Sequence, residues 1–161
     1  MMFELELDEA KEGFRKIIDN AEMLIKDTEI LAGKDRYTSF PFGILSLEEI
    51  GKAILLAKTI QKSTQKVRIG KWWISHCKKL RSALTFNSGI PENLIDYIIT
   101  TLEKARVEGL YVDWKDEMWI YPQHEGMAWL MRLRSPNDAE QIIGSAKNLL
   151  KEVKETYEDN L

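Results

Sequence analysis

The stretch GILSLEEIGKAILLAKTI, Gly43–Ile60, decides the fold of this chain. At about 100° per residue, one apolar stripe runs along it, formed by Leu47, Ile50, Ile54 and Ala57. Further leucines cover much of the remaining circumference. A helix that is apolar nearly all round is buried in a protein core. The sequence therefore predicts an all-α protein, a helical bundle packed around this segment.

Three charged side chains interrupt this apolar helix, namely Glu48, Glu49 and Lys52. A buried charge is tolerated only when it is paired and hydrogen-bonded. Both glutamates stand at contact spacing from Lys52, i,i+4 and i,i+3, with the acid on the N-terminal side. Two interpretations stay open: an ordinary surface ion pair, or a polar site or partner interface inside the bundle. The spacing leaves open which glutamate faces inward.

Length and composition are those of a globular protein. The 161 residues are enough for one domain with a real hydrophobic core. No run approaches the roughly 20 apolar residues that span a membrane, and the acidic start MMFELELDEA lacks the features of a signal peptide. We therefore expect a cytoplasmic protein without membrane association.

Cysteine and histidine are too few for the common metal sites. Cys77 is the only cysteine, which excludes an intramolecular disulfide, and only His76 and His124 accompany it. A zinc site made of such ligands is not expected, and no other metal or cofactor is indicated. Acids cluster at Asp113, Asp116 and Glu117, but no histidine has a matching ligand spacing, and Cys77 itself is expected to be a small core residue.

The net charge of -3 conceals a strong asymmetry. Between Ile50 and Pro91 there is no acidic residue, and all 26 acids lie elsewhere. The basic residues of this segment are Lys52, Lys58, Lys62, Lys66, Arg68, Lys71, Lys78, Lys79 and Arg81. A local positive field can attract phosphate despite an acidic total. The alternative is a solvated face that favours solubility.

Apolar spacing and capping residues predict about five helices in all. Besides the central one, they cover Asp8–Ala32, Lys71–Leu84, Ile90–Gly109 and a segment from Pro136 into the charged tail. Asp8 is the expected N-cap of the first helix, and Gly33 its left-handed C-cap. Lys62–Gly70 is expected to be a basic loop or a frayed helix end.

The same spacing predicts which faces are buried. The third helix should bury Trp73, Cys77, Leu80 and Leu84, and the fourth Leu94, Ile98, Leu102 and Ala105. His76 then stands at the border between core and water, where neighbours can tune its protonation, and Lys79 points further toward solvent. A histidine in such a place can be structural or catalytic.

Aromatic and β-branched residues surround a polar centre in Leu110–Pro122. This pattern predicts a short hairpin-like insertion near residues 110–121, whose tryptophans pack on the bundle. The pattern of the following Gln123–Arg134 is ambiguous, although Met127, Leu130 and Met131 have the spacing of a short helical turn.

Three motifs, in this order, resemble the AbiV family of abortive-infection proteins, a branch of the HEPN helical-bundle superfamily. They are SLEEIGKA at Ser46–Ala53, HCKKL at His76–Leu80, and LYVDW at Leu110–Trp114 followed by Trp119 and Pro122. The resemblance implies a single HEPN-like domain over residues 1–161 that forms a homodimer. It also implies a role in bacterial or archaeal defence against phage and a link to RNA.

The resemblance further implies a chemistry. Many HEPN proteins are metal-independent ribonucleases with an Arg-x4-6-His motif assembled across a dimer. A histidine can shuttle the proton of a 2′-hydroxyl, while a cation stabilises the phosphorane. This chain departs from the motif, because seven residues separate Arg68 from His76, and Lys71 stands at the four-residue spacing.

Two functional hypotheses follow. In the first, the protein is a ribonuclease or RNA-binding toxin whose catalytic residues are His76, Lys79, Glu49 and Lys52. In this hypothesis His76 transfers the proton, and Lys79 and Lys71 hold the phosphate. Glu49 and Lys52 orient the site. Further contacts to RNA come from Arg68, Lys78 and Arg81. In the second, the protein is a non-catalytic dimeric module that binds a phage or host protein, and the polar residues, Glu48 included, form a buried network.

Overall fold

The computed structural model describes residues 3–34, 39–110, 113–115, 118–120 and 136–161. This part of the chain holds five α-helices, so the expected all-α class is confirmed: α1 (Leu7–Ala32), α2 (Ser39–Ile60), α3 (His76–Thr85), α4 (Glu92–Leu110) and α6 (Pro136–Tyr157). Short 3-10 helices lie at η1 (Lys71–Ile74) and η3 (Glu158–Asn160). None of the described helices is both long and apolar enough to cross a membrane.

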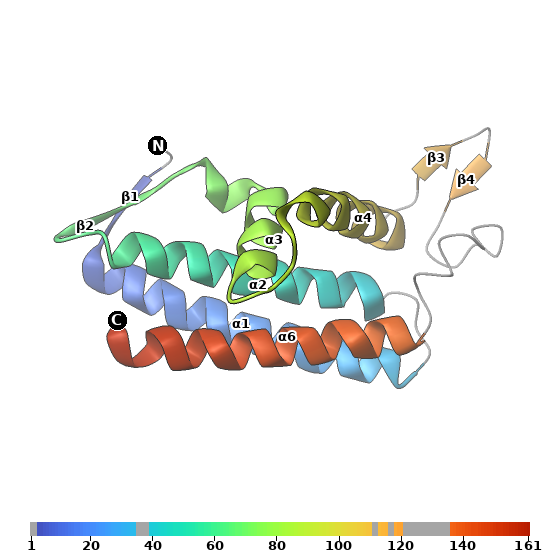
Figure 1. The fold of residues 1–161 in the computed structure, drawn as a ribbon, viewed down its shortest axis with the longest axis horizontal. Helices are drawn as coiled ribbons and strands as arrows, with labels where there is room; N and C mark the ends of the chain where they lie inside the picture. The colour runs from blue at the N-terminus through green and yellow to red at the C-terminus, as the bar shows by residue number, and fades with distance from the viewer. Residues whose placement is uncertain (1–2, 35–38, 111–112, 116–117, 121–135) are drawn as a thin grey trace.

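Helix α2 is the centre of the fold. Helices α1, α2 and α6 run side by side, while α3 and α4 lie across the other side of α2 (Figure 1). The stripe of Leu47, Ile50, Ile54 and Ala57 is buried, as its spacing predicts. α2 contacts α1, α3, α4 and α6. The apolar circumference of this helix is thus explained by neighbours on several sides.

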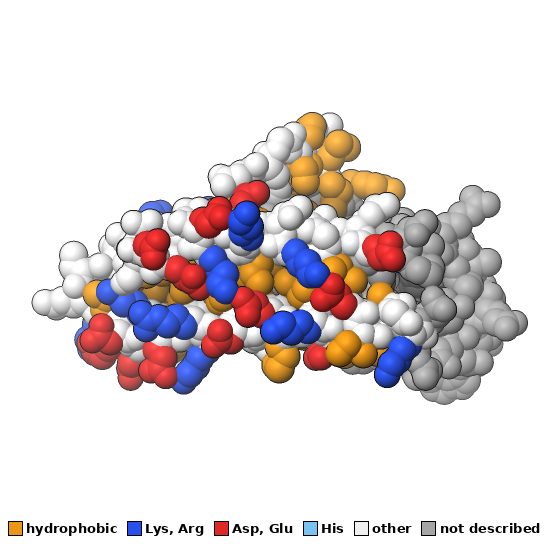
Figure 2. Space-filling model, turned by 90° about the horizontal axis from the view of Figure 1, so that it is seen from below, with side chains coloured by type: hydrophobic (Ala, Val, Ile, Leu, Met, Phe, Trp, Pro, Cys, Tyr) orange, Lys and Arg blue, Asp and Glu red, His pale blue; other side chains and the backbone are white. Residues whose placement is uncertain are grey.

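The outer face of α1 and α6 carries side chains of both charges, with apolar side chains visible between them (Figure 2). Lys147 contacts Glu29 at 2.5 Å, and Lys154 contacts Glu22, so ion pairs join the two helices. Beneath them α6 buries an apolar side that includes Ile142, Ala146 and Val153. Each helix therefore has the amphipathic character of a bundle surface.

The ends of α1 differ from the sequence prediction. The helix begins at Leu7 after the N-cap Glu6, whose N–H donates to the Glu9 carboxylate at 2.9 Å, and Asp8 lies in the first turn. Gly33 does end the helix, but its φ of -64° is right-handed, so the left-handed cap was wrong. Its N–H bonds the Glu29 carbonyl at 2.9 Å, which satisfies the helix end without a left-handed turn.

A strand replaces part of the basic loop expected over Lys62–Gly70. Strand β2 (Lys66–Ile69) pairs antiparallel with β1 (Phe3–Glu6), with Phe3 opposite Ile69 and Glu6 opposite Lys66. Val67 and Ile69 are fully buried, while Lys66 and Arg68, which alternate with them, are exposed. This period of two is that of a half-buried strand, and its partner lies far away in sequence.

The third predicted helix is broken at Ser75. Its extended backbone, φ -90° and ψ 106°, separates η1 from α3, and its hydroxyl accepts a hydrogen bond from the Lys78 N–H at 3.4 Å. The break rotates the following residues, so the predicted buried face was wrong in part. Cys77 is exposed instead of core, and Lys79 is buried instead of facing solvent.

Helix α4 also turns a different face to the core. Ile95, Ile99, Ala105 and Arg106 are buried, whereas Leu94 is 46% exposed and Ile98 and Leu102 are half-buried. The hairpin is confirmed in its backbone, with β3 (Asp113–Lys115) antiparallel to β4 (Met118–Ile120). The packing of its tryptophans and the turn within Gln123–Arg134 lie outside the described residues.

Candidate functional site

Glu48 is the most buried acidic residue of the described chain, with 2% of its surface exposed in the middle of α2. Its Oε2 atom lies 2.5 Å from His76 Nδ1 and 3.6 Å from Lys79 Nζ. Its Oε1 atom lies 3.2 Å from Arg106 Nε. One carboxylate from α2 therefore joins a histidine and a lysine from α3 and an arginine from α4.

A glycine allows α3 to approach α2 this closely. Gly51 lies about one turn after Glu48 on α2, and a Cβ there would overlap the backbone carbonyl of Lys79. Only a residue without a side chain permits this contact between the helices. Gly51 thus places the first turns of α3, with His76 and Lys79, against the buried carboxylate.

A second acid completes the cluster from α4. Glu103 Oε2 accepts hydrogen bonds from Arg106 at 2.8 Å (Nη2) and 3.3 Å (Nε). Its Oε1 accepts from the Cys77 thiol, with a sulfur–oxygen distance of 3.8 Å. The Arg106 side chain is 10% exposed, and the Glu103 side chain 20%. Arg106 is thus shared between two carboxylates.

The sequence analysis missed Glu103 and Arg106. The sequence does contain a signal for the arginine. Helical spacing places Arg106 in line with an apolar stripe formed by Ile95, Ile99 and Leu102. Glu103 stands three residues before Arg106, at contact spacing. An arginine at a stripe position, with an acid one turn before it, indicates a buried ion pair.

The cluster is balanced in charge. Glu48 and Glu103 supply two negative charges, and Lys79 and Arg106 supply two positive ones. Glu48 Oε1 is close to Arg106 Nε but makes no hydrogen bond of good geometry there, so this contact is mainly electrostatic.

His76 is the accessible member of the cluster. Its side chain is 44% exposed, against 3% for Glu48 and 9% for Lys79. A neutral imidazole that donates its Nδ1–H to Glu48 carries its lone pair on Nε2. The carboxylate of Glu48 fixes the orientation of the ring and the tautomer that leaves Nε2 free. The arrangement suits a group that accepts and returns a proton.

Three side chains of this cluster also offer ligand atoms for a metal ion. Ligand atoms of Glu48, His76 and Glu103 all lie within 4.8 Å of one another. Two carboxylates and an imidazole can bind a divalent ion. Here, however, both carboxylates already contact cationic side chains, so a metal ion would have to compete with Lys79 and Arg106. The charge balance favours chemistry without a bound ion.

The other predicted site residues lie apart from Glu48. Lys52 contacts Glu49 at 3.2 Å, and its Nζ stands 4.7 Å from the centre of the Trp73 ring. Arg81 pairs with Glu92 and Asp96, and Arg68 pairs with Glu4 at 3.0 Å. Lys71 and Lys78 are exposed near the start of α3. Of the four residues predicted to be catalytic, His76 and Lys79 contact Glu48 directly.

Cys77 is poorly suited to be a nucleophile. Partial burial, followed by the negative charge of Glu103 and the hydrogen bond to it, raises the pKa of the thiol above its ordinary value. A thiol with a raised pKa carries little thiolate near neutral pH. The chemistry of this site therefore centres on the imidazole next to it.

Comparison with known proteins bears on the whole arrangement. Neither a curated protein nor a solved structure matches the chain. The family model HEPN_AbiV, described as AbiV, matches residues 9–151, which include all five members of the cluster. The match covers most of the chain and agrees with the helical bundle built around α2. The chain belongs to the AbiV family of abortive-infection HEPN proteins.

Proposed function

We propose that this protein is a metal-independent endoribonuclease that acts in the cytoplasm as an effector of phage defence. One observation carries the proposal, the 2.5 Å contact between the buried carboxylate of Glu48 and Nδ1 of the half-exposed His76. Such a pair supplies a general base that works near neutral pH. Family membership gives the cellular context, and the geometry supports the reaction class.

The reaction is an internal phosphoryl transfer within RNA. Nε2 of His76 takes the proton from a 2′-hydroxyl, and the 2′-oxygen attacks the adjacent phosphorus. The bond from phosphorus to the 5′-oxygen breaks, and this oxygen leaves with the proton that His76 carries. The products are a 2′,3′-cyclic phosphate and a 5′-hydroxyl. Glu48 stabilises the imidazolium between the two proton transfers.

The cations divide into two groups. Lys79 and Arg106 are nearly buried and contact the Glu48 carboxylate, so they help to position the base rather than hold substrate. Lys71 and Lys78 are exposed near the start of α3, and in this proposal they neutralise the phosphate of the substrate. In this proposal Glu48 takes the orienting role that the sequence suggested for Glu49 and Lys52.

The test is incubation of the purified protein with total cellular RNA in EDTA, beside the His76→Ala variant. The proposal predicts cleavage by the first and none by the second, with 2′,3′-cyclic phosphate ends. A second arm replaces EDTA with Mn²⁺ or Mg²⁺. Cleavage that appears only with the ion would instead assign Glu48, His76 and Glu103 as metal ligands.

A second candidate is a non-catalytic module that forms a homodimer and binds a phage or host protein. It is favoured by the burial of Lys79 and Arg106, because side chains 9% and 10% exposed can serve to tie three helices together. Helix α4 also leaves Leu94 and Tyr97 exposed, at 46% and 73%. This candidate predicts no RNA cleavage in EDTA or with added metal ion. It also predicts that the Tyr97→Asp variant has a lower mass than the native protein in light scattering, because the dimer is lost.

A further inference from the structure

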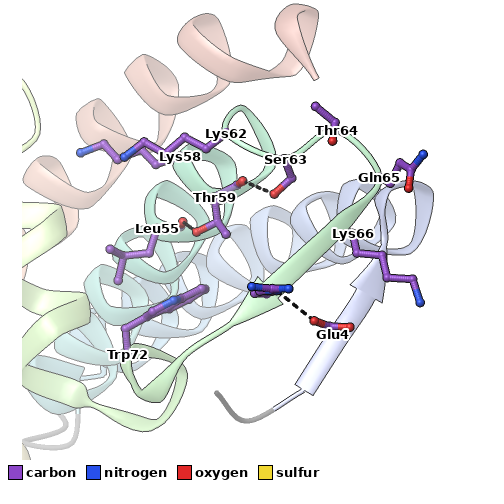
Figure 3. A pocket seen from close by; sticks show the side chains of 11 residues that line it. Glu4, Leu55, Lys58, Thr59, Lys62, Ser63, Thr64, Gln65, Lys66 and Trp72 are labelled. Atoms are coloured by element: carbon purple, nitrogen blue, oxygen red, sulfur yellow. Dashed lines mark hydrogen bonds and ion pairs between the residues drawn. The ribbon is translucent and has the colours of Figure 1, made fainter.

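A second polar hollow lies beyond the cluster, toward the C-terminal end of α2. It has a volume of about 690 Å³ and is open to solvent between α2, β2 and η1 (Figure 3). Its lining includes Lys58, Lys62, Lys66, Arg68 and Trp72, with Glu4 as its single acid. Four cations and an aromatic ring thus surround one concave surface.

Two of these cations have no acidic partner in the part of the chain that the structure describes. Lys66 and Arg68 contact Glu6 and Glu4 across the strand pair, at 3.4 Å and 3.0 Å. Within the described residues, neither Lys58 nor Lys62 makes an ion pair, and both side chains are among those that line the hollow (Figure 3). Lys58 lies in the last turn of α2, and Lys62 follows in the turn after the helix end at Ile60. Both lysines line the same hollow, and a bound anion there would neutralise their charges.

The aromatic wall is held in place by its neighbours. Trp72 packs edge-on against Trp73, with ring centroids 5.5 Å apart and an angle of 65°. It also lies against Gly70, where a Cβ would stand 3.2 Å from Trp72 Cδ1. Trp72 therefore presents a fixed surface to the hollow, at little entropic cost for a planar ligand.

The helix end itself does not attract an anion. The C-terminus of a helix is the negative end of its dipole. Thr59 and Ser63 donate their hydroxyls back to the carbonyls of Leu55 and Thr59, at 2.7 Å and 2.8 Å. Charge for an anion must therefore come from the two lysines, and affinity for the rest of the ligand from the aromatic ring.

We infer that this hollow binds a nucleotide unit of single-stranded RNA, with its phosphate between Lys58 and Lys62 and its base against Trp72. Single strands bind proteins through this combination of basic groove and stacking surface. Leu55, which lines the hollow, lies seven residues after Glu48 on α2, or about 10 Å along the axis. The inference rests on the proposed function, because the hollow would hold a nucleotide that flanks the bond cut at His76.

Binding is measured by fluorescence anisotropy with a labelled single-stranded RNA of twelve nucleotides. All proteins carry His76→Ala, so that the probe stays intact. Trp72→Ala should weaken binding by about 5- to 150-fold, the cost of losing one stacked base, and Trp72→Phe should restore part of it. Because the two lysines share one phosphate, Lys58→Gln with Lys62→Gln should lower the slope of log affinity against log salt by about 0.7.

The matched control is Lys16→Gln with Lys151→Gln, which removes the same charge at positions 73% and 76% exposed on α1 and α6. It should change affinity far less than the hollow variants. A duplex of equal length should bind weakly, since its base faces are covered. The inference would be overturned if the hollow variants bound the RNA as tightly as the control variant. It would also be overturned if a duplex and polyglutamate competed as well as the single strand.

The two proposals fail separately. If the protein with native His76 cuts RNA and the hollow variants keep its KM and affinity, the ribonuclease stands and the hollow is refuted. If the single strand binds through Trp72 and the lysines but the native protein cuts nothing, the hollow stands and the catalytic proposal is refuted.

Discussion

Replacing Glu48 by Gln should destabilise the protein far more than the same change at the next residue. Gln keeps the size of the side chain but removes its charge. Lys79 then loses its acidic partner at 3.6 Å, while Arg106 keeps Glu103. Breaking a buried ion pair costs about 3–5 kcal/mol. Because His76 is half exposed and Arg106 keeps a partner, we expect about 3 kcal/mol here.

For a chain of this length, that loss lowers Tm by about 6–12 °C. Glu49→Gln is the matched control, because Glu49 is 17% exposed and contacts only Lys52 among the described partners. It should cost about 1 kcal/mol or less. The measurement is thermal unfolding followed by circular dichroism. Equal shifts for the two variants, or a Glu48→Gln shift below about 2 °C, would refute the assignment of Glu48 as the centre of the buried network.

Three further predictions follow from the contacts. Gly51→Ala should lower the free energy of unfolding by about 1–3 kcal/mol and reduce RNA cleavage, because the added methyl group meets the Lys79 backbone. Gly144→Ala is the control, since a Cβ there has nothing within 4 Å, and it should change neither stability nor cleavage. Equal melting temperatures for the two variants would contradict the prediction. Glu103→Gln should lower the raised pKa of Cys77 and speed its alkylation by iodoacetamide near pH 8; an unchanged rate would count against it. The hydrogen bond to Glu22 raises the pKa of Lys154 above 10.5, so its contribution to stability is complete below that pH and is lost as pH rises through the folded pKa. As the pH is raised into the alkaline range, the Tm of Lys154→Met should therefore fall less than the Tm of the native protein. A larger fall in the variant would contradict the prediction.

The centre of the fold was predictable because its signal is local. Gly43–Ile60 is apolar on nearly every side, and a helix of that kind has to be covered. The prediction failed where a partner lies far away in sequence. Strand β2 depends on β1 at the other end of the first two helices, and a four-residue strand carries little signal by itself.

The candidate site was predictable only in part for the same reason. His76 could be placed at the edge of the core from the apolar stripe beside it. Lys79 was expected in solvent, because a lysine is rarely buried unless it is paired, and its acid lies on another helix. The break at Ser75 then changed the face of α3, although a serine before a helical segment is itself a capping signal. Local patterns identify faces, and long-range contacts decide which charges those faces can bury.

The most direct test is the initial rate at which the protein cleaves one fluorogenic RNA oligonucleotide in EDTA, compared with its His76→Ala variant. His76 is 44% exposed, so the variant should fold normally, as a matched thermal melt will show. Loss of a general base lowers a rate by about 10²–10⁴-fold, and we predict a fall in this range, with Glu49→Gln close to the native rate. A native protein that leaves the RNA intact, or a His76→Ala variant within about tenfold of the native rate, would contradict the account.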